Sequence, residues 1–165
     1  MSKSTDLTPG MTDTTTGRIV GEFADAATEI REAIATERQF ADEENPSGES
    51  QLAADLVADD LLEERLLALD GVGSYASEER ESVTVDEGHR HVAVDPLDGS
   101  SNLEPNSGMG TIFGVYDTQP PTIGRNLVAA GFVIYGPTTS MVVARNDRVR
   151  EYIIHDGDAR VVDDD

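Results

Sequence analysis

The chain has 165 residues, no cysteine, and 33 Asp and Glu against 12 Lys and Arg, which gives a net charge of −21. This length suits one domain with a hydrophobic core. The lack of cysteine excludes disulfide frameworks and thiolate metal sites, and the negative charge disfavours a nucleic-acid partner. No apolar run reaches the roughly 18 residues of a membrane helix, and the N-terminus lacks a secretory signal pattern. We therefore expect a soluble cytoplasmic protein without a membrane partner.

The acidic composition has a physical interpretation other than disorder. Hydrophobic residues make up 38% of the chain and fall in periodic blocks, and Lys3 is the sole lysine. Abundant Asp and Glu with almost no lysine resembles haloarchaeal proteins, whose solvated acidic surface suits a salt-rich cytoplasm. Residues 1–16 are rich in Thr, Ser, Asp and Gly and predict a flexible tail, which leaves 17–165 as the domain.

Two helices are expected near the start of the domain. Apolar residues at three-to-four spacing predict an amphipathic helix over 17–42. Residues 43–48 have the composition of a loop, and leucines at helical spacing predict a second helix over 49–70, closed by Gly71.

The rest of the chain is rich in short β-branched and aromatic runs. These runs predict strands over 72–76, 82–85, 90–94, 111–117, 132–135, 140–144 and 149–154. The second and third form a hairpin in this interpretation, and His89 and His91 are ordinary residues beside its turn. The expected class is α+β, with the helices packed on a mixed, largely antiparallel sheet.

One stretch of the sequence contains the candidate metal-binding and anion-binding residues. Asp95 and Asp98 stand three residues apart where an apolar strand is expected to break at Pro96. Two carboxylates this close repel unless a cation lies between them, and hard oxygens suit Mg²⁺ or Mn²⁺. The small residues 99–102 follow at once and let backbone N–H groups approach an anion. The alternative without a ligand is an Asp-Gly turn between two strands.

The letters of this stretch resemble a known signature. Asp-Pro-Leu-Asp-Gly-Ser-Ser-Asn at 95–102 is similar to the motif of class 1 fructose-1,6-bisphosphatases, and 110–116 resembles that family's next strand. Residues 125–132 resemble a family segment in which a short helix leads into a strand. Inositol monophosphatases have a related motif, but the Ser-Ser pair favours the bisphosphatase.

The resemblance implies roles for individual residues. The metal ligands that it implies are Glu78, Asp95, the Leu97 carbonyl and Asp98, with Glu49 as a doubtful addition. Glu49 departs from the family's Asp at that position by its longer side chain. The pair implied to orient the attacking water is Asp55 and Glu79. The residues implied to bind the substrate phosphate are Asp98, Gly99, Ser100 and Ser101. Glu81 matches no motif and is expected to be solvated.

The resemblance also implies an activity. It is the metal-dependent hydrolysis of fructose 1,6-bisphosphate to fructose 6-phosphate, as in gluconeogenesis, with two or more Mg²⁺ per site, Mn²⁺ being possible, in a homo-oligomer, a tetramer in the family. Family members carry a second, carboxyl-terminal domain that is missing here, so we expect an incomplete enzyme that is weakly active alone. The alternatives are an inositol monophosphatase-like sugar phosphatase and a non-catalytic half that binds metal or phosphate.

Overall fold

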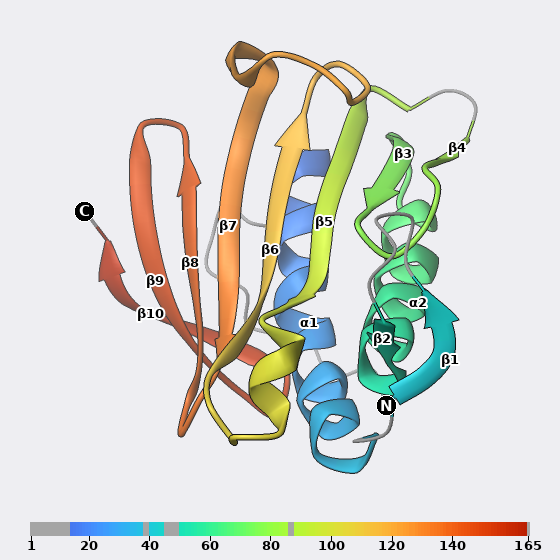
Figure 1. Cartoon of the computed structure of the whole chain (residues 1–165). Coiled ribbons are helices and arrows are strands. Elements are labelled where there is room, and N and C mark those ends of the chain that lie inside the picture. Colours follow the sequence, from blue (N-terminus) through green and yellow to red (C-terminus); the bar gives the residue numbers. More distant parts are fainter. Residues whose placement is uncertain (1–13, 38–39, 45–49, 86–87, 165) are drawn as a thin grey trace, which may run out of the picture.

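The computed structural model describes residues 14–37, 40–44, 50–85 and 88–164, and it consists of two helices on one face of a large sheet (Figure 1). The strands of this sheet follow the order β10-β9-β8-β7-β6-β5-β3-β4. All neighbours are antiparallel except β3 and β5, which are parallel. The expected α+β class, with helices on a mixed, largely antiparallel sheet, is confirmed.

The helices are shorter than the apolar pattern predicted. Helix α1 spans Thr15–Thr36, and the Thr14 hydroxyl caps it by accepting the Gly17 N–H at 3.1 Å. The predicted extension to residue 42 is wrong, because the last buried position is Ala33 and strand β1, Phe40–Glu44, follows. Helix α2 spans Ala53–Leu67, since residues 50–52 form strand β2 instead of the first helical turn.

The predicted hairpin between residues 82–85 and 90–94 is wrong, because both segments pair with β3 instead of with each other. Strand β3 spans Val72–Ser77, and the short β4, Val83–Thr84, pairs with β3. Strand β5, Arg90–Asp98, then lies parallel on the other side of β3. The chain can return this way because Gly88 packs on the backbone of Gly73, where a Cβ on Gly88 would come within 1.9 Å of the Gly73 nitrogen.

The remaining strands form an antiparallel meander. Strands β6, Met109–Tyr116, β8, Thr139–Arg145, and β9, Arg148–His155, match the predicted positions within a few residues. The expected short helix near residue 125 is only a 3₁₀ turn, η2, Gly124–Asn126, and β7 begins at once as Leu127–Tyr135. Strand β10, Asp158–Asp164, was not predicted, because its alternation is hidden by acidic residues.

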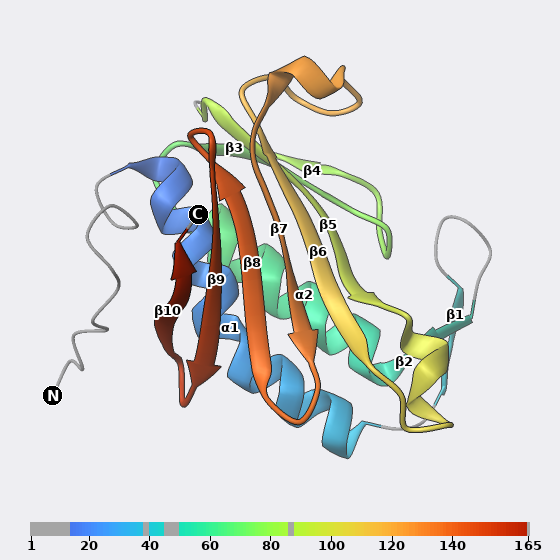
Figure 2. The same ribbon diagram turned by 90° about the vertical axis from the view of Figure 1, so that its left-hand side faces the viewer.

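The core lies between the helices and the sheet. Alternate residues of β6 point toward the helices, and Phe113 stacks on Phe23 of α1 with ring centroids 3.9 Å apart. Figure 2 shows both helices on the same face of the sheet. On the opposite face, Ile112, Phe132 and Ile134 are exposed, with 39–47% of their surface accessible. No helix in the described ranges is long and apolar enough to span a bilayer.

Candidate active site

The site is built around a bulge at the end of β5. Asp95 is paired with Ile112 of β6 and Asp98 with Gly110, so β5 has one more residue than its partner between these positions. Pro96 lies in this bulge, where its missing N–H leaves no gap in the ladder, so the predicted break at Pro96 is in fact an irregular continuation of the strand. The Pro96 carbonyl accepts the buried Thr111 hydroxyl at 2.8 Å. The bulge therefore fixes where both aspartates emerge.

A tight loop follows the bulge. Gly99 has a φ of +77°, in the region that favours glycine, and precedes the 3₁₀ turn η1, Ser100–Leu103. Asn102 closes the loop, since its side-chain amide donates to the Gly108 carbonyl at 3.0 Å and its backbone N–H to the Gly99 carbonyl at 2.8 Å. Asp98, Gly99 and Asn102 line an open cavity of about 410 Å³ that continues over β6 and β7.

Asp55 reaches the site from the first turn of α2. Its Oδ2 accepts the Leu52 backbone N–H at 2.8 Å, which caps the helix. The residue is 2% exposed, and Oδ1 has no hydrogen-bond partner among the described residues. Burial raises the pKa of Asp55, the Leu52 N–H and the Ser100 side chain lower it, and the charge of Glu78 raises it again. Oδ2 of this carboxylate therefore caps the helix, whereas Oδ1 is buried without a hydrogen-bond partner among the described residues.

Glu78 and Glu79 come from the end of β3, beside β5. The Glu78 N–H donates to the Val94 carbonyl at 3.2 Å, and the Glu79 N–H to the Ser77 hydroxyl at 3.1 Å. Burial raises the pKa of Asp95 to about 7, together with a hydrogen bond between Asp95 and Glu78 and the charges of Glu78 and Asp98. A hydrogen bond between two carboxyl groups requires one of them to carry a proton. The like charges of Glu78, Asp95 and Asp98 therefore favour a positive charge between them.

This donor set fits a divalent cation. Within the described residues, no group of three or more Asp, Glu or His side chains is arranged to hold a metal ion. The acids are nevertheless neighbours, because Glu78 acts on both Asp55 and Asp95, and Asp98 acts on Asp95. Carboxylate oxygens are the ligands that Mg²⁺ and Mn²⁺ prefer. A cation would offset the negative charge of Glu78, Asp95 and Asp98, which otherwise raises the pKa of Asp95.

Comparison with known proteins agrees with this geometry. The sequence model of a family described as fructose-1-6-bisphosphatase, N-terminal domain, matches residues 19–160. The chain belongs to this family. It is 59% identical over its whole length to fructose-1,6-bisphosphatase class 1 1 of Haloarcula marismortui and covers 57% of that protein. It is 55% identical, over 89% of its length, to fructose-1,6-bisphosphatase class 1 of Natronomonas pharaonis and covers 53% of it.

The fold is similar to that of a solved bisphosphatase. The crystal structure of Leishmania major fructose-1,6-bisphosphatase in holo form matches 90% of this chain and 53% of that one, with a TM-score of 0.81 and 22% identity. This likeness supports the fold alone. The chain spans about half the length of the curated relatives that it matches. These two relatives are haloarchaeal, in agreement with the salt-adapted composition.

Several of the residues that the bisphosphatase resemblance implied lie near one another in the structure. The charge of Glu78 acts on both Asp55 and Asp95, and the charge of Asp98 acts on Asp95. Glu79 is half-buried next to Glu78, and Glu81 is exposed as expected. Glu49 lies outside the described residues. Leu97 has a buried side chain, and Ser101 is an exposed residue of η1.

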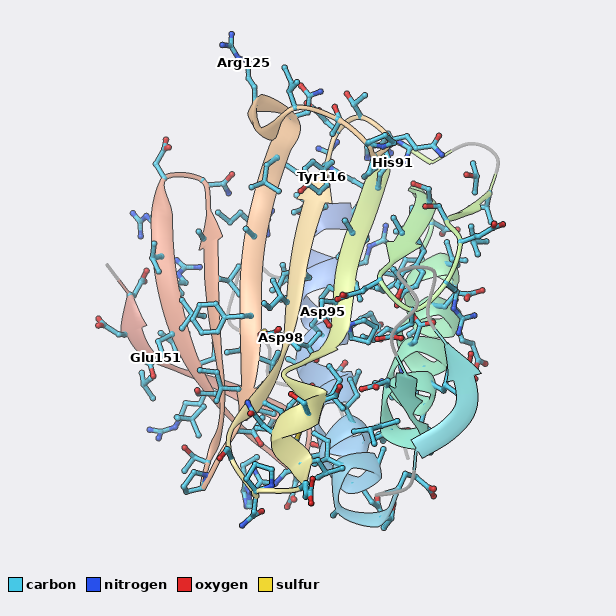
Figure 3. The ribbon with its side chains drawn as sticks, in the orientation of Figure 1. His91, Asp95, Asp98, Tyr116, Arg125 and Glu151 are labelled. Atoms are coloured by element: carbon cyan, nitrogen blue, oxygen red, sulfur yellow. The ribbon has the colours of Figure 1, made fainter. Side chains whose placement is uncertain are left out.

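His91 lies away from the candidate site. His91 is at the far end of β5 from Asp95 and Asp98, opposite Tyr116 (Figure 3). Its Nδ1 is 2.9 Å from the Ser74 hydroxyl, and burial lowers its pKa. The interpretation of His91 as an ordinary strand residue is consistent with this packing.

One group was missed by the sequence analysis. Asp59 is fully buried one turn after Asp55 on α2, and it contacts Tyr75 and Arg80. The signal available in the sequence was weak: an acid four residues after Asp55, and a lone arginine just after the Glu78-Glu79 pair. In a chain with 33 acidic residues, such spacing has no special meaning without the fold.

Proposed function

We propose that this chain supplies the metal-binding half of an enzyme that hydrolyses fructose 1,6-bisphosphate to fructose 6-phosphate and phosphate. The observation that carries the proposal is the buried Oδ1 of Asp55, which has no hydrogen-bond partner among the described residues and lies near the negative charge of Glu78. The names of the relatives at 55–59% identity support the same substrate. The sugar phosphate would enter through the open cavity beside Asp98 and Gly99.

Each group has a role that follows from its position. Glu78, Asp95, Asp98 and the Leu97 carbonyl would hold two Mg²⁺ ions, with Glu49 as a further candidate and Mn²⁺ as a possible substitute. When bound, the ions polarise the phosphoryl oxygens and stabilise the leaving alkoxide. Gly99, Ser100 and Ser101 bind the transferred phosphate through N–H and hydroxyl groups, which are the donors that phosphate accepts.

The proton of the attacking water needs an acceptor. Asp55 and Glu79 take this role: the water oxygen forms the new P–O bond, its proton passes to a carboxylate, and the sugar oxygen leaves and is protonated. Burial raises the pKa of Asp55, which makes its carboxylate a stronger base than an exposed aspartate. The Leu52 N–H holds this carboxylate in place during the transfer.

A phosphate-release assay tests the proposal. This chain and the full-length Haloarcula marismortui relative, of which it covers 57%, are compared in molar KCl with Mg²⁺ or with EDTA. We expect Mg²⁺-dependent release from fructose 1,6-bisphosphate by the full-length protein and little by the 165-residue chain alone. Faster release from inositol phosphate would favour the sugar-phosphatase alternative, and equal turnover by both chains would refute the need for the remaining half.

The finer properties of the assembly belong to the same proposal. We infer a cytoplasmic homo-oligomer, a tetramer as in the resembled family, with Mg²⁺ as the physiological ion. Light scattering of the full-length protein in molar KCl tests the subunit number. Phosphate release with Mg²⁺ and Mn²⁺ in turn tests the metal.

A further inference from the structure

Arg80 binds three acids of one helix. Its Nε donates to Asp59, its Nη2 to Asp60 and its Nη1 to Glu63, all on α2. Every guanidinium nitrogen is therefore used, and the planar fork of arginine makes such a triple contact possible where a lysine could not. The contact joins the chain just after β3 to the helix that carries Asp55.

The key partner is Asp59, because it has no access to solvent. It is 0% exposed and accepts the Tyr75 hydroxyl at 2.7 Å as well as Arg80. A buried carboxylate is strongly destabilising without such partners. The Asp59–Arg80 pair is thus a buried anchor, in contrast to the outer contact with Asp60, whose side chain is 73% exposed.

The two residues that contact Asp59 lie on either side of two acids of the site in the sequence. Tyr75 precedes and Arg80 follows the pair Glu78-Glu79, and both end on the same carboxylate. Between them, the Glu78 N–H is bonded to Val94 of β5. The segment is therefore tied at both ends to α2 and at its centre to the strand that leads to Asp95.

We propose that Arg80 is a positioning residue, which holds Glu78 and Glu79 at a fixed spacing from Asp55 so that the acids are arranged for a cation before it binds. Asp55 and Asp59 are four residues apart on α2, so they lie on the same side of the helix one turn apart. A movement of residues 78–80 away from α2 would separate Glu78 from Asp55. The inference rests on the proposed function, because it assumes that these acids bind Mg²⁺.

A matched control is present on the same helix. Arg65 ties α2 to α1 through Glu29 and, at 3.9 Å, Glu22, and its side chain is 28% exposed against 30% for Arg80. Arg65 makes no contact with the segment after β3 among the ion pairs of the described residues. R65Q therefore removes a comparable ion-pair cluster without touching the acids of the site.

The experiment measures Mg²⁺ affinity by calorimetry at constant KCl, and hydrogen exchange of residues 77–82, in the 165-residue chain and its variants. We expect R80Q to weaken Mg²⁺ binding about 10-fold, the lower range for groups that support metal ligands, and to speed exchange in 77–82. R65Q should change the affinity less than about twofold, and it should lower Tm less than R80Q does, because Glu29 is 55% exposed whereas Asp59 is fully buried. R80K, which keeps the charge, replaces R80Q if that variant does not fold, and it should weaken binding in the same direction.

The outcomes separate the two claims. An R80Q chain that folds and binds Mg²⁺ as well as the unaltered chain would overturn the inference and leave the proposed function standing. If the unaltered chain takes up no Mg²⁺, the proposed function fails, and hydrogen exchange then decides. Faster exchange of 77–82 in R80Q than in R65Q would keep Arg80 as the positioning residue, and equal exchange would overturn it.

Discussion

Replacing Asp55 by asparagine should stabilise the fold and weaken its response to magnesium. Asparagine keeps an oxygen that can accept the Leu52 N–H, so the cap of α2 survives. Its amide NH₂ would stand where Oδ1 now has no partner among the described residues, near Ser100 and Glu78. A buried unsatisfied polar group costs about 1–3 kcal/mol, and the lower end of that range, about 1 kcal/mol, is the expected gain. For a chain of this size it corresponds to a rise of about 2–4 °C in Tm.

With Mg²⁺ present, the unaltered chain should become more stable than D55N. A ligand present at about 100 times its Kd stabilises the folded state by about 2.7 kcal/mol. The unaltered chain would gain this amount, whereas D55N would gain far less because the neutral amide contributes no negative charge. Thermal unfolding in molar KCl, with EDTA and then with a Mg²⁺ series, measures both quantities on the same samples.

The control is Glu64→Gln, an exposed acid on the same helix. It removes one charge from α2 without touching the site, so E64Q should behave like the unaltered chain with and without Mg²⁺. If D55N were less stable than the unaltered chain in EDTA by about 1 kcal/mol or more and kept the full Mg²⁺ shift, the interpretation of Oδ1 as an uncompensated ligand-facing oxygen would be wrong.

Three further predictions concern the loop, the motif and the surface. Asp98→Asn should abolish Mg²⁺-dependent phosphate release in a full-length protein with this segment, whereas Glu81→Gln should leave it nearly intact; retained activity of D98N would contradict the site assignment. Gly99→Ala should lower the free energy of unfolding by about 1 kcal/mol, because its φ of +77° is unfavourable with a Cβ; an unchanged Tm would argue against this loop geometry. Dialysis from molar to about 0.1 M KCl, where the Debye length is about 10 Å, should unfold the chain through repulsion among its net −21 charges; a CD spectrum and Tm unaffected by salt would disprove the halophilic interpretation.

The sequence was sufficient where local chemistry decides the structure. Gly99 follows an aspartate at a point where the chain must turn, and the structure gives it a positive φ. The apolar run at 111–117 predicted a strand, and β6 is found there with alternate residues buried in the core. In both cases the physical cause acts over a few residues, so the local sequence is enough to predict the structure.

The sequence was insufficient where distant segments decide. Strand β4 has two residues, and nothing in them distinguishes pairing with β3 from pairing with β5. Helix α1 stops at Thr36 because no core remains beyond Ala33, which is a fact about the sheet and not about helix propensity. Arg80 was passed over for the same reason, since its three partners are 17–21 residues away.

Burial separates the acids that serve the site from those that only solvate the surface. Asp55 and Asp59 are the two acids among the buried residues of the described chain, and they are one turn apart on α2. Asp59 is compensated by Tyr75 and Arg80, whereas Asp55 leaves one oxygen without a partner among the described residues. Selection for stability alone would replace Asp55, because an asparagine, or a second hydrogen-bond donor to Oδ1, would lower the free-energy penalty of burying this side chain. The contrast between two neighbouring carboxylates therefore argues that Asp55 is kept for a ligand and Asp59 for the fold.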